Sequence, residues 1–240
     1  NLRSLPESDP EGRLQVIFAI ESADDPAYAV ARKVAETYPG RDIMILLTGP
    51  SGERMGKAHN MIEALPKARH AGGVFSDADV AADRALVVET GRAFAAGQGA
   101  FYATPYFRSA RWPGQALFAA SFNHGFSAAG ALMRRLGAFR GYSGAWMGFS
   151  RETLAKIGGI ERVAFKAADD YALGVAVREA GIEIGLLRRL AELREPDADL
   201  LETVRHFFKW GVVIRGAAAP VFAAAFAHSA VMFLFVVSAV

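Results

Sequence analysis

Short apolar runs alternate with helical patterns along residues 13–105. The runs typical of buried strands occupy residues 14–20, 43–48, 74–75 and 100–104. The amphipathic patterns typical of helices occupy residues 26–38, 57–68 and 83–96. Strands that alternate with helices form a parallel sheet covered on both faces, and ligands bind at the carboxyl ends of its strands. We therefore expect an α/β domain with its site at that edge.

The second half of the chain is less regular. Helical patterns recur at residues 114–136, 151–157 and 169–180. Further strands are predicted at residues 141–150 and 182–187. No internal repeat or low-complexity linker interrupts these elements, so we assign residues 1–198 to one catalytic domain.

The C-terminal part predicts contact with a membrane. Residues 199–215 read as an amphipathic helix, and residues 216–240 contain no Asp, Glu, Lys or Arg. About twenty such residues form a transmembrane helix, although an Ala-rich segment of this kind also suits a buried helix. Basic residues just before the span favour a catalytic domain on the cytoplasmic face, which we expect to be that of a bacterial inner membrane. The chain begins at Asn1 rather than Met, and we expect further residues at both ends.

The amino-acid composition excludes several classes of function. The absence of Cys excludes disulfide scaffolds, zinc–thiolate sites and Cys nucleophiles. The net charge of +2, without a basic stripe, gives no reason to expect nucleic acid as a partner. The five His residues lack metal-ligand spacing, and no nucleophile elbow or dinucleotide fingerprint is present.

Acidic residues follow the apolar segments at three places. They are Glu21, Asp24 and Asp25 after the first strand, Asp77 and Asp79 after the third, and Asp169 and Asp170 at the start of a helix. A D-x-D pair can place two carboxylates on Mg²⁺ or Mn²⁺, which prefer oxygen ligands and bridge diphosphates. Two explanations without a functional role stay open. Asp197-Ala198-Asp199 is a second D-x-D, in a predicted loop, and acidic residues at the start of a helix also stabilise its dipole.

The segment Thr48–Ala58 resembles a phosphate-binding P-loop but fails that pattern. Its second Gly comes one residue early, and Ala58 stands where a hydroxyl residue holds Mg²⁺. Lys57 can still neutralise a diphosphate at a helix start, with Asn60 one turn on. Alternatively, Lys57 is a surface residue of an amphipathic helix.

The order of these motifs resembles the ceramide glucosyltransferase type of family 2/21 glycosyltransferases. That family carries three spaced aspartate motifs and then a Q/R-x-x-R-W motif before membrane segments, and the resemblance covers residues 13–215. Its motifs are matched here by Asp24-Asp25, Asp77-Ala78-Asp79 and Asp169-Asp170-Tyr171. The resemblance implies nucleotide contacts from the first motif together with Glu21, a metal on Asp77 and Asp79, and Asp170 as catalytic base.

Other positions acquire roles from the same resemblance. Lys57 and Asn60 match a family Lys/Asn pair at the donor, and His124 and Trp146 fall on the acceptor side. Lys209 and Trp210 stand where the family has its Arg-Trp pair, which places them at the donor diphosphate. The motif departs from the family because His206 replaces Gln or Arg and Lys209 lacks the bidentate fork of Arg.

The resemblance implies a GT-A-like α/β fold with an interfacial helix and a transmembrane helix. The expected reaction is inverting transfer of a hexose from a UDP-sugar to a membrane lipid hydroxyl such as that of ceramide. Glucose is the hexose that we expect. Hopanoid and diacylglycerol acceptors fit equally, and Mg²⁺ or Mn²⁺ is the expected cofactor. Two alternatives of other classes stay open: a nucleotidyltransferase on a similar fold, and a non-catalytic membrane scaffold.

Overall fold

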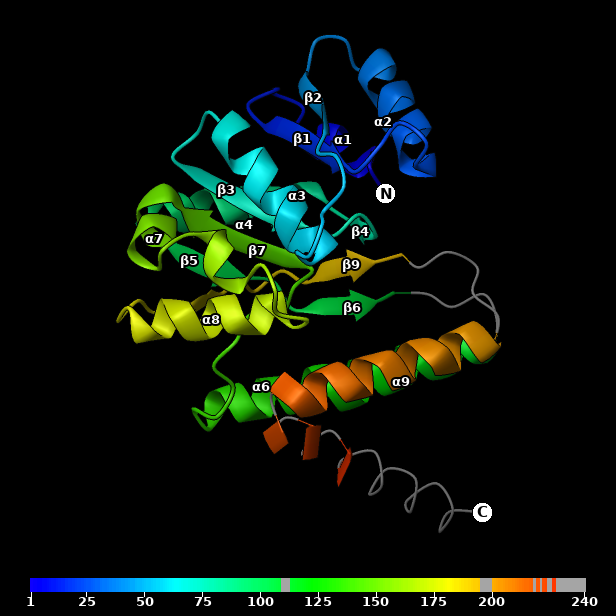
Figure 1. Cartoon of the computed structure of the whole chain (residues 1–240), viewed down its shortest axis with the longest axis vertical. Coiled ribbons are helices and arrows are strands. Elements are labelled where there is room, and N and C mark those ends of the chain that lie inside the picture. Colours follow the sequence, from blue (N-terminus) through cyan, green and yellow to red (C-terminus); the bar gives the residue numbers. More distant parts are fainter. Residues whose placement is uncertain (109–112, 195–199, 218, 221, 224–225, 228–240) are drawn as a thin grey trace.

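The computed structural model describes the chain except residues 109–112, 195–199, 218, 221, 224–225 and 228–240 (Figure 1). The first half contains α1 (Ser4–Ser8), β1 (Gln15–Ile20), α2 (Pro26–Thr37), β2 (Asp42–Leu47), α3 (Gly56–Ala64), β3 (Gly72–Ser76), β4 (Val80–Ala81), α4 (Arg84–Ala95), β5 (Ala100–Tyr102) and β6 (Pro105–Phe107). The second half contains α5 (Pro113–Ala120), α6 (Ala128–Arg135), β7 (Trp146–Ser150), α7 (Arg151–Lys156), α8 (Asp169–Glu179), β8 (Gly185–Leu186), β9 (Ala191–Leu193) and α9 (Leu200–Ala217).

Local signals fix where several helices begin and end. The Asp25 carboxylate accepts a hydrogen bond from the Ala27 amide at 2.8 Å, and Pro26 occupies the first turn of α2. The Asp83 carboxylate caps α4 in the same way. The predicted helix at 57–68 becomes α3 followed by a 3₁₀ turn at Leu65–Lys67, because Pro66 cannot donate to an α-helical ladder.

The prediction of a purely parallel sheet is wrong, because the sheets are mixed. β1 pairs with β2 in parallel, but in the order β3-β7-β5-β8 strand β7 runs antiparallel to both of its neighbours. The third sheet has the order β4-β9-β6 (Figure 1). Strand β7 reaches its place after the chain has passed through α5 and α6, so local strand–helix alternation carries no information about its direction.

Several predicted elements are shorter than their patterns, and three strands were missed. The strand expected at 141–150 is confined to β7, and the one at 182–187 to β8. The helix expected at 114–136 is continuous, but it contains a π-helix at Ser121–Ser127 between α5 and α6. Strands β4, β6 and β9 have only two or three residues each, too few to show a period.

The predicted amphipathic helix corresponds to α9, which packs against α5 at the end of the molecule far from the N-terminus (Figure 1). Within the described part of the chain, no helix combines the length and the apolar character needed to cross a bilayer. Most of the predicted span at 216–240 lies outside the described residues, as do Asp197 and Asp199 of the second D-x-D.

Candidate active site

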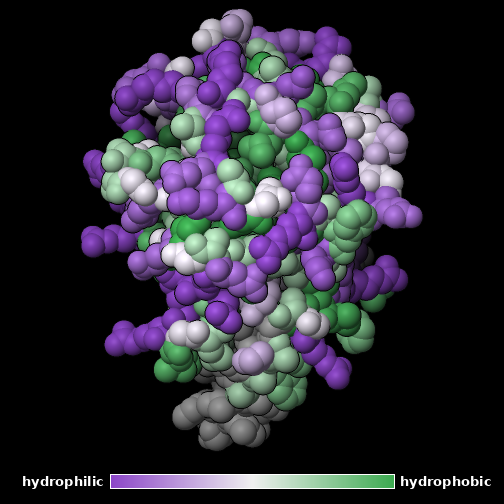
Figure 2. Space-filling model, turned by 60° about the vertical axis from the view of Figure 1, so that its left-hand side comes forward, coloured by the Kyte–Doolittle hydropathy of each residue, from purple (hydrophilic) through white to green (hydrophobic). Residues whose placement is uncertain are grey.

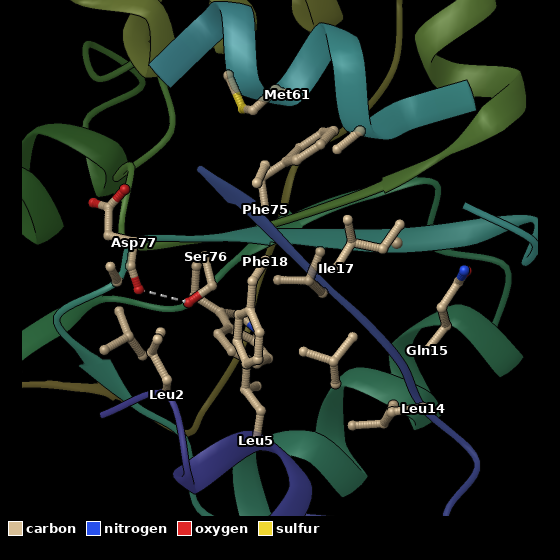
Figure 3. A pocket seen from close by; sticks show the side chains of 18 of the residues that line it. Leu2, Leu5, Leu14, Gln15, Ile17, Phe18, Met61, Phe75, Ser76 and Asp77 are labelled. Carbon is tan, nitrogen blue, oxygen red and sulfur yellow. Dashed lines mark hydrogen bonds between the residues drawn. The ribbon is translucent and has the colours of Figure 1, made fainter. Parts of the chain in front are cut away.

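A cavity of about 730 Å³ opens between β1 and β3. Figure 3 shows apolar side chains, among them Leu5 and Phe18, along its floor and Asp77 at one end. The cavity is also lined by Glu21, Asp25, Lys57 and Asn60, of which Lys57 contacts Asp77. Several polar residues predicted at the strand ends therefore line this cavity, and we refer to its end at Asp77 and Lys57 as its mouth.

Lys57 joins two segments at this mouth. Its ammonium lies 2.6 Å from Oδ1 of Asp77, and it donates a hydrogen bond of 3.0 Å to the carbonyl oxygen of Gly144. Lys57 comes from the first turn of α3, Asp77 follows β3, and Gly144 precedes β7. Residues far apart in the sequence are thus held together around one positive charge.

Asp169 and Asp170 open α8 beside this lysine. A Cβ atom built on Gly144 would lie 2.8 Å from Oδ2 of Asp170 and 3.0 Å from Nζ of Lys57, so both groups border the same glycine. The other oxygen of Asp170 accepts from the Tyr171 amide at 2.7 Å. Asp169 is 8% exposed, and its Oδ2 has no hydrogen-bond partner among the described residues.

These surroundings shift the protonation of Asp170. Desolvation raises its pKa to about 6, and the negative charges of Asp169 and Asp77 act in the same direction. The positive charge of Lys57 opposes this rise. A carboxyl group with a pKa near 6 is ionised at neutral pH and is more basic than an ordinary Asp, as a general base requires.

The charge of Lys57 is maintained by the same carboxylates. Burial acts to lower the pKa of its ammonium, but Asp77, Asp169 and Asp170 more than offset that effect, so the pKa is raised. The cluster therefore has three acidic groups around one permanent positive charge at neutral pH.

Close backbone packing fixes α8 in this position. Gly174 of α8 faces Gly141 so closely that a Cβ on it would lie 2.5 Å from the Gly141 carbonyl carbon and 2.6 Å from the Tyr142 nitrogen. The Tyr142 amide also donates to the Asp170 carbonyl at 3.4 Å. The absence of a side chain at Gly174 therefore sets the distance between the helix that carries Asp170 and the segment that leads to Gly144.

The residues at the mouth fit a divalent cation only together with a donor. No three His, Asp or Glu side chains of the described residues gather in a metal-binding arrangement. Mg²⁺ is often held by one or two carboxylates and completed by substrate phosphates. The Asp77 side chain, 37% exposed and lining the cavity, suits that role.

The sequence profile described as Glycosyl transferase family 21 matches residues 1–240, which is the whole chain. The chain belongs to glycosyl transferase family 21. No individual curated protein matches it. The family confirms the resemblance deduced from the motif order, and it sets the nucleotidyltransferase alternative aside.

The other donor residues predicted for this family 21 glycosyltransferase are only partly brought together. Asn60 accepts a hydrogen bond from Thr48 at 2.7 Å and donates to the Ala19 carbonyl at 3.4 Å, so it ties β1 to the end of β2. Glu21 and Asp25 reach the cavity, whereas Asp24 and Asp79 are not among the described residues that line it. Both acids of the D-x-D lie in a turn after β3, which is closed by the Val80 amide on the Asp77 carbonyl at 3.2 Å.

The two residues predicted on the acceptor side of the glycosyltransferase differ in exposure. Trp146 is 3% exposed, borders the cavity, and donates through Nε1 to Thr90 at 3.0 Å. His124 is exposed on the π-helix, next to Asn123, whose side chain bonds both backbone groups of Phe107. The π-helix presenting His124 is thereby fixed to β6.

The final family motif lies on α9. Lys209 is exposed there, and the Trp210 ring lies in an aromatic cluster, 5.3 Å from the ring of Phe122 and 6.0 Å from that of Phe118. These contacts hold α9 against α5 and the π-helix. Contact of Lys209 and Trp210 with the donor stays a prediction.

Two residues that shape the site, Gly174 and Thr48, were not predicted from the sequence. Gly174 sits inside a helix, where an isolated glycine signals a close approach without naming the partner. Thr48 ends a predicted strand, and nothing in the sequence indicated that its hydroxyl would orient Asn60. Of these two residues, only Gly174 carried a signal in the sequence, which is its place inside a helical pattern.

Proposed function

We propose that this family 21 glycosyltransferase transfers a hexose from a UDP-sugar to the hydroxyl of a membrane lipid such as ceramide. Glucose is the hexose that we propose. The observation that carries the proposal is the cluster in which Lys57 contacts Asp77 at the mouth of the cavity and borders Gly144 together with Asp170. It combines a basic carboxylate, a positive charge for a diphosphate and an acid suited to a cation. The mixed α/β architecture fits the GT-A-like fold of the proposal.

In the proposed reaction, Asp170 removes the proton from the acceptor hydroxyl as its oxygen bonds to the anomeric carbon. The bond from that carbon to the diphosphate breaks, and UDP leaves on the opposite side, so the configuration inverts. Lys57 lies where its charge can stabilise the leaving diphosphate. Asp77, with Asp79 as the second predicted ligand, would hold Mg²⁺ or Mn²⁺, which supplies further stabilisation of that charge.

An apolar stripe on α9 supports a lipid acceptor. Leu201, Val204, Phe208 and Val212 follow helical spacing and are 53–76% exposed. Arg205 and Lys209 are exposed on the same helix. Figure 2 shows green residues gathered at the lower end of the molecule, with purple side chains projecting around them. A helix with exposed apolar and basic residues suits the interface of an anionic membrane, from which the lipid would be presented.

A transfer assay tests the proposed function. Full-length enzyme in detergent micelles with UDP-glucose and Mn²⁺ should release UDP only when a lipid acceptor is added, and mass spectrometry should identify the glycolipid. Separate arms with ceramide, a hopanoid and diacylglycerol identify the acceptor. UDP binding without release in any arm would favour the scaffold alternative.

A liposome assay tests the membrane surface. Phe208→Gln together with Val212→Gln should lower binding to anionic vesicles about tenfold or more, since burying each apolar side chain contributes up to roughly 2 kcal/mol. The control is Val88→Gln on α4, where Val88 is 39% exposed. Equal binding by the double variant and the control would show that α9 is an ordinary exposed helix.

A further inference from the structure

Lys57 occupies the side of Asp77 that faces the carboxylate cluster. Its ammonium contacts Oδ1 at 2.6 Å and is held on its other side by the Gly144 carbonyl at 3.0 Å. A divalent cation bonds a carboxylate oxygen at about 2.0–2.2 Å, so it cannot share that side of the oxygen with the ammonium. A cation bound nearby would also be repelled by the lysine charge.

The surrounding acids nevertheless attract more positive charge than one lysine supplies. Asp77, Asp169 and Asp170 all act on Lys57, and Asp169 retains a buried oxygen without a partner among the described residues. Three carboxyl groups therefore surround the one ammonium of Lys57. Lys57 therefore supplies positive charge to this cluster and is in contact with Asp77.

We propose that Lys57 is the resident cation of the cluster and makes divalent cation binding depend on the donor. Without donor, Lys57 holds Asp77 and Mg²⁺ or Mn²⁺ binds weakly. When a nucleoside diphosphate enters, its negative charge draws the flexible lysine away from Asp77, and the freed carboxylate and the phosphates bind the cation together. The inference deepens the proposed function and rests on its donor being a nucleoside diphosphate sugar.

Direct Mn²⁺ binding tests this role. The signal of free Mn²⁺ in electron paramagnetic resonance, with full-length protein and no acceptor lipid, gives affinity with and without UDP. Wild type should bind Mn²⁺ weakly alone and at least tenfold more tightly with UDP. Lys57→Gln, whose amide can still donate to the Gly144 carbonyl, should bind Mn²⁺ at least tenfold more tightly than wild type without UDP, and UDP should add less.

Two further variants locate the effect. Adding Asp77→Asn to Lys57→Gln should abolish the gain, because the site is built on that carboxylate. Lys156→Gln, which removes a lysine paired with Glu152 at 2.8 Å on α7, should behave as wild type. Equal Mn²⁺ affinity of Lys57→Gln and wild type without UDP would overturn the proposal, as would a gain that survives Asp77→Asn.

A thermal shift keeps the test decisive if Lys57→Gln is less stable. Mn²⁺ alone should raise the melting temperature of the variant more than that of wild type, because a ligand stabilises the state that binds it. An equal shift in both proteins would count against the lysine. Failure of lipid-dependent UDP release in the transfer assay would refute the proposed function without altering these binding results.

Discussion

Asp170→Asn should lower sugar transfer by roughly 10²–10⁴-fold while leaving the affinity for UDP nearly unchanged. The amide keeps the shape of the side chain and can accept the Tyr171 hydrogen bond, but it cannot take a proton from the acceptor. Single-turnover measurements with saturating donor and acceptor, beside UDP titrations, separate the two quantities. Wild-type turnover in the variant would refute the assignment of the base.

Asp169→Asn is the matched control for this substitution. Its amide oxygen can still accept from the Asp170 backbone nitrogen, as the carboxylate does at 2.9 Å. Since the charge of Asp169 contributes to the raised pKa of Asp170, its removal should lower that pKa. We expect turnover at neutral pH to change only a few-fold, in contrast to the loss caused by Asp170→Asn.

The pH profile gives a second readout of the same group. Because the base must be ionised and the pKa of Asp170 is raised to about 6, kcat/KM should rise with pH through that value and level off above it. Asp169→Asn should move the acidic limb to lower pH. An acidic limb that is identical in the two proteins would contradict the electrostatic coupling of the two carboxylates.

Gly174→Ala should destabilise the fold by about 2–4 kcal/mol and reduce transfer as well. Its new methyl would collide with backbone atoms of Gly141 and Tyr142, which cannot rotate away as a side chain can. The strain is relieved only if α8 moves outward, and Asp170 moves with it. Urea unfolding measures the stability, and the transfer assay measures the displacement of the base.

Gly130→Ala on α6 provides the opposite result. A Cβ atom at Gly130 meets nothing within 4 Å, so alanine there should stabilise the helix by roughly 0.5–1 kcal/mol. If Gly174→Ala were as stable as Gly130→Ala, the close contact between α8 and the segment before β7 would not constrain the site.

Much of the fold follows from signals within the sequence. The caps at Asp25 and Asp83 come from residues that act on their own backbone, and the helices expected at 26–38 and 83–96 were predicted nearly to the residue. The helix expected at 57–68 was predicted too long, because α3 ends before Pro66. The helix expected at 169–180 corresponds to α8, which begins at Asp169 and ends at Glu179. The acids of the candidate site stood out in the sequence because each follows or opens an element whose pattern is strong.

The tertiary structure decided how those elements meet. The direction of β7, the contact of Asp77 with Lys57 and the position of Trp210 among phenylalanine rings each depend on contacts between distant segments. Lys57 illustrates both contributions. The sequence indicated that it could be a counter-charge, but only the tertiary structure brought Asp77 and the Gly144 carbonyl into contact with it. Periodicity and capping act over a few residues, whereas strand insertion and charge pairing depend on the packing of the whole chain.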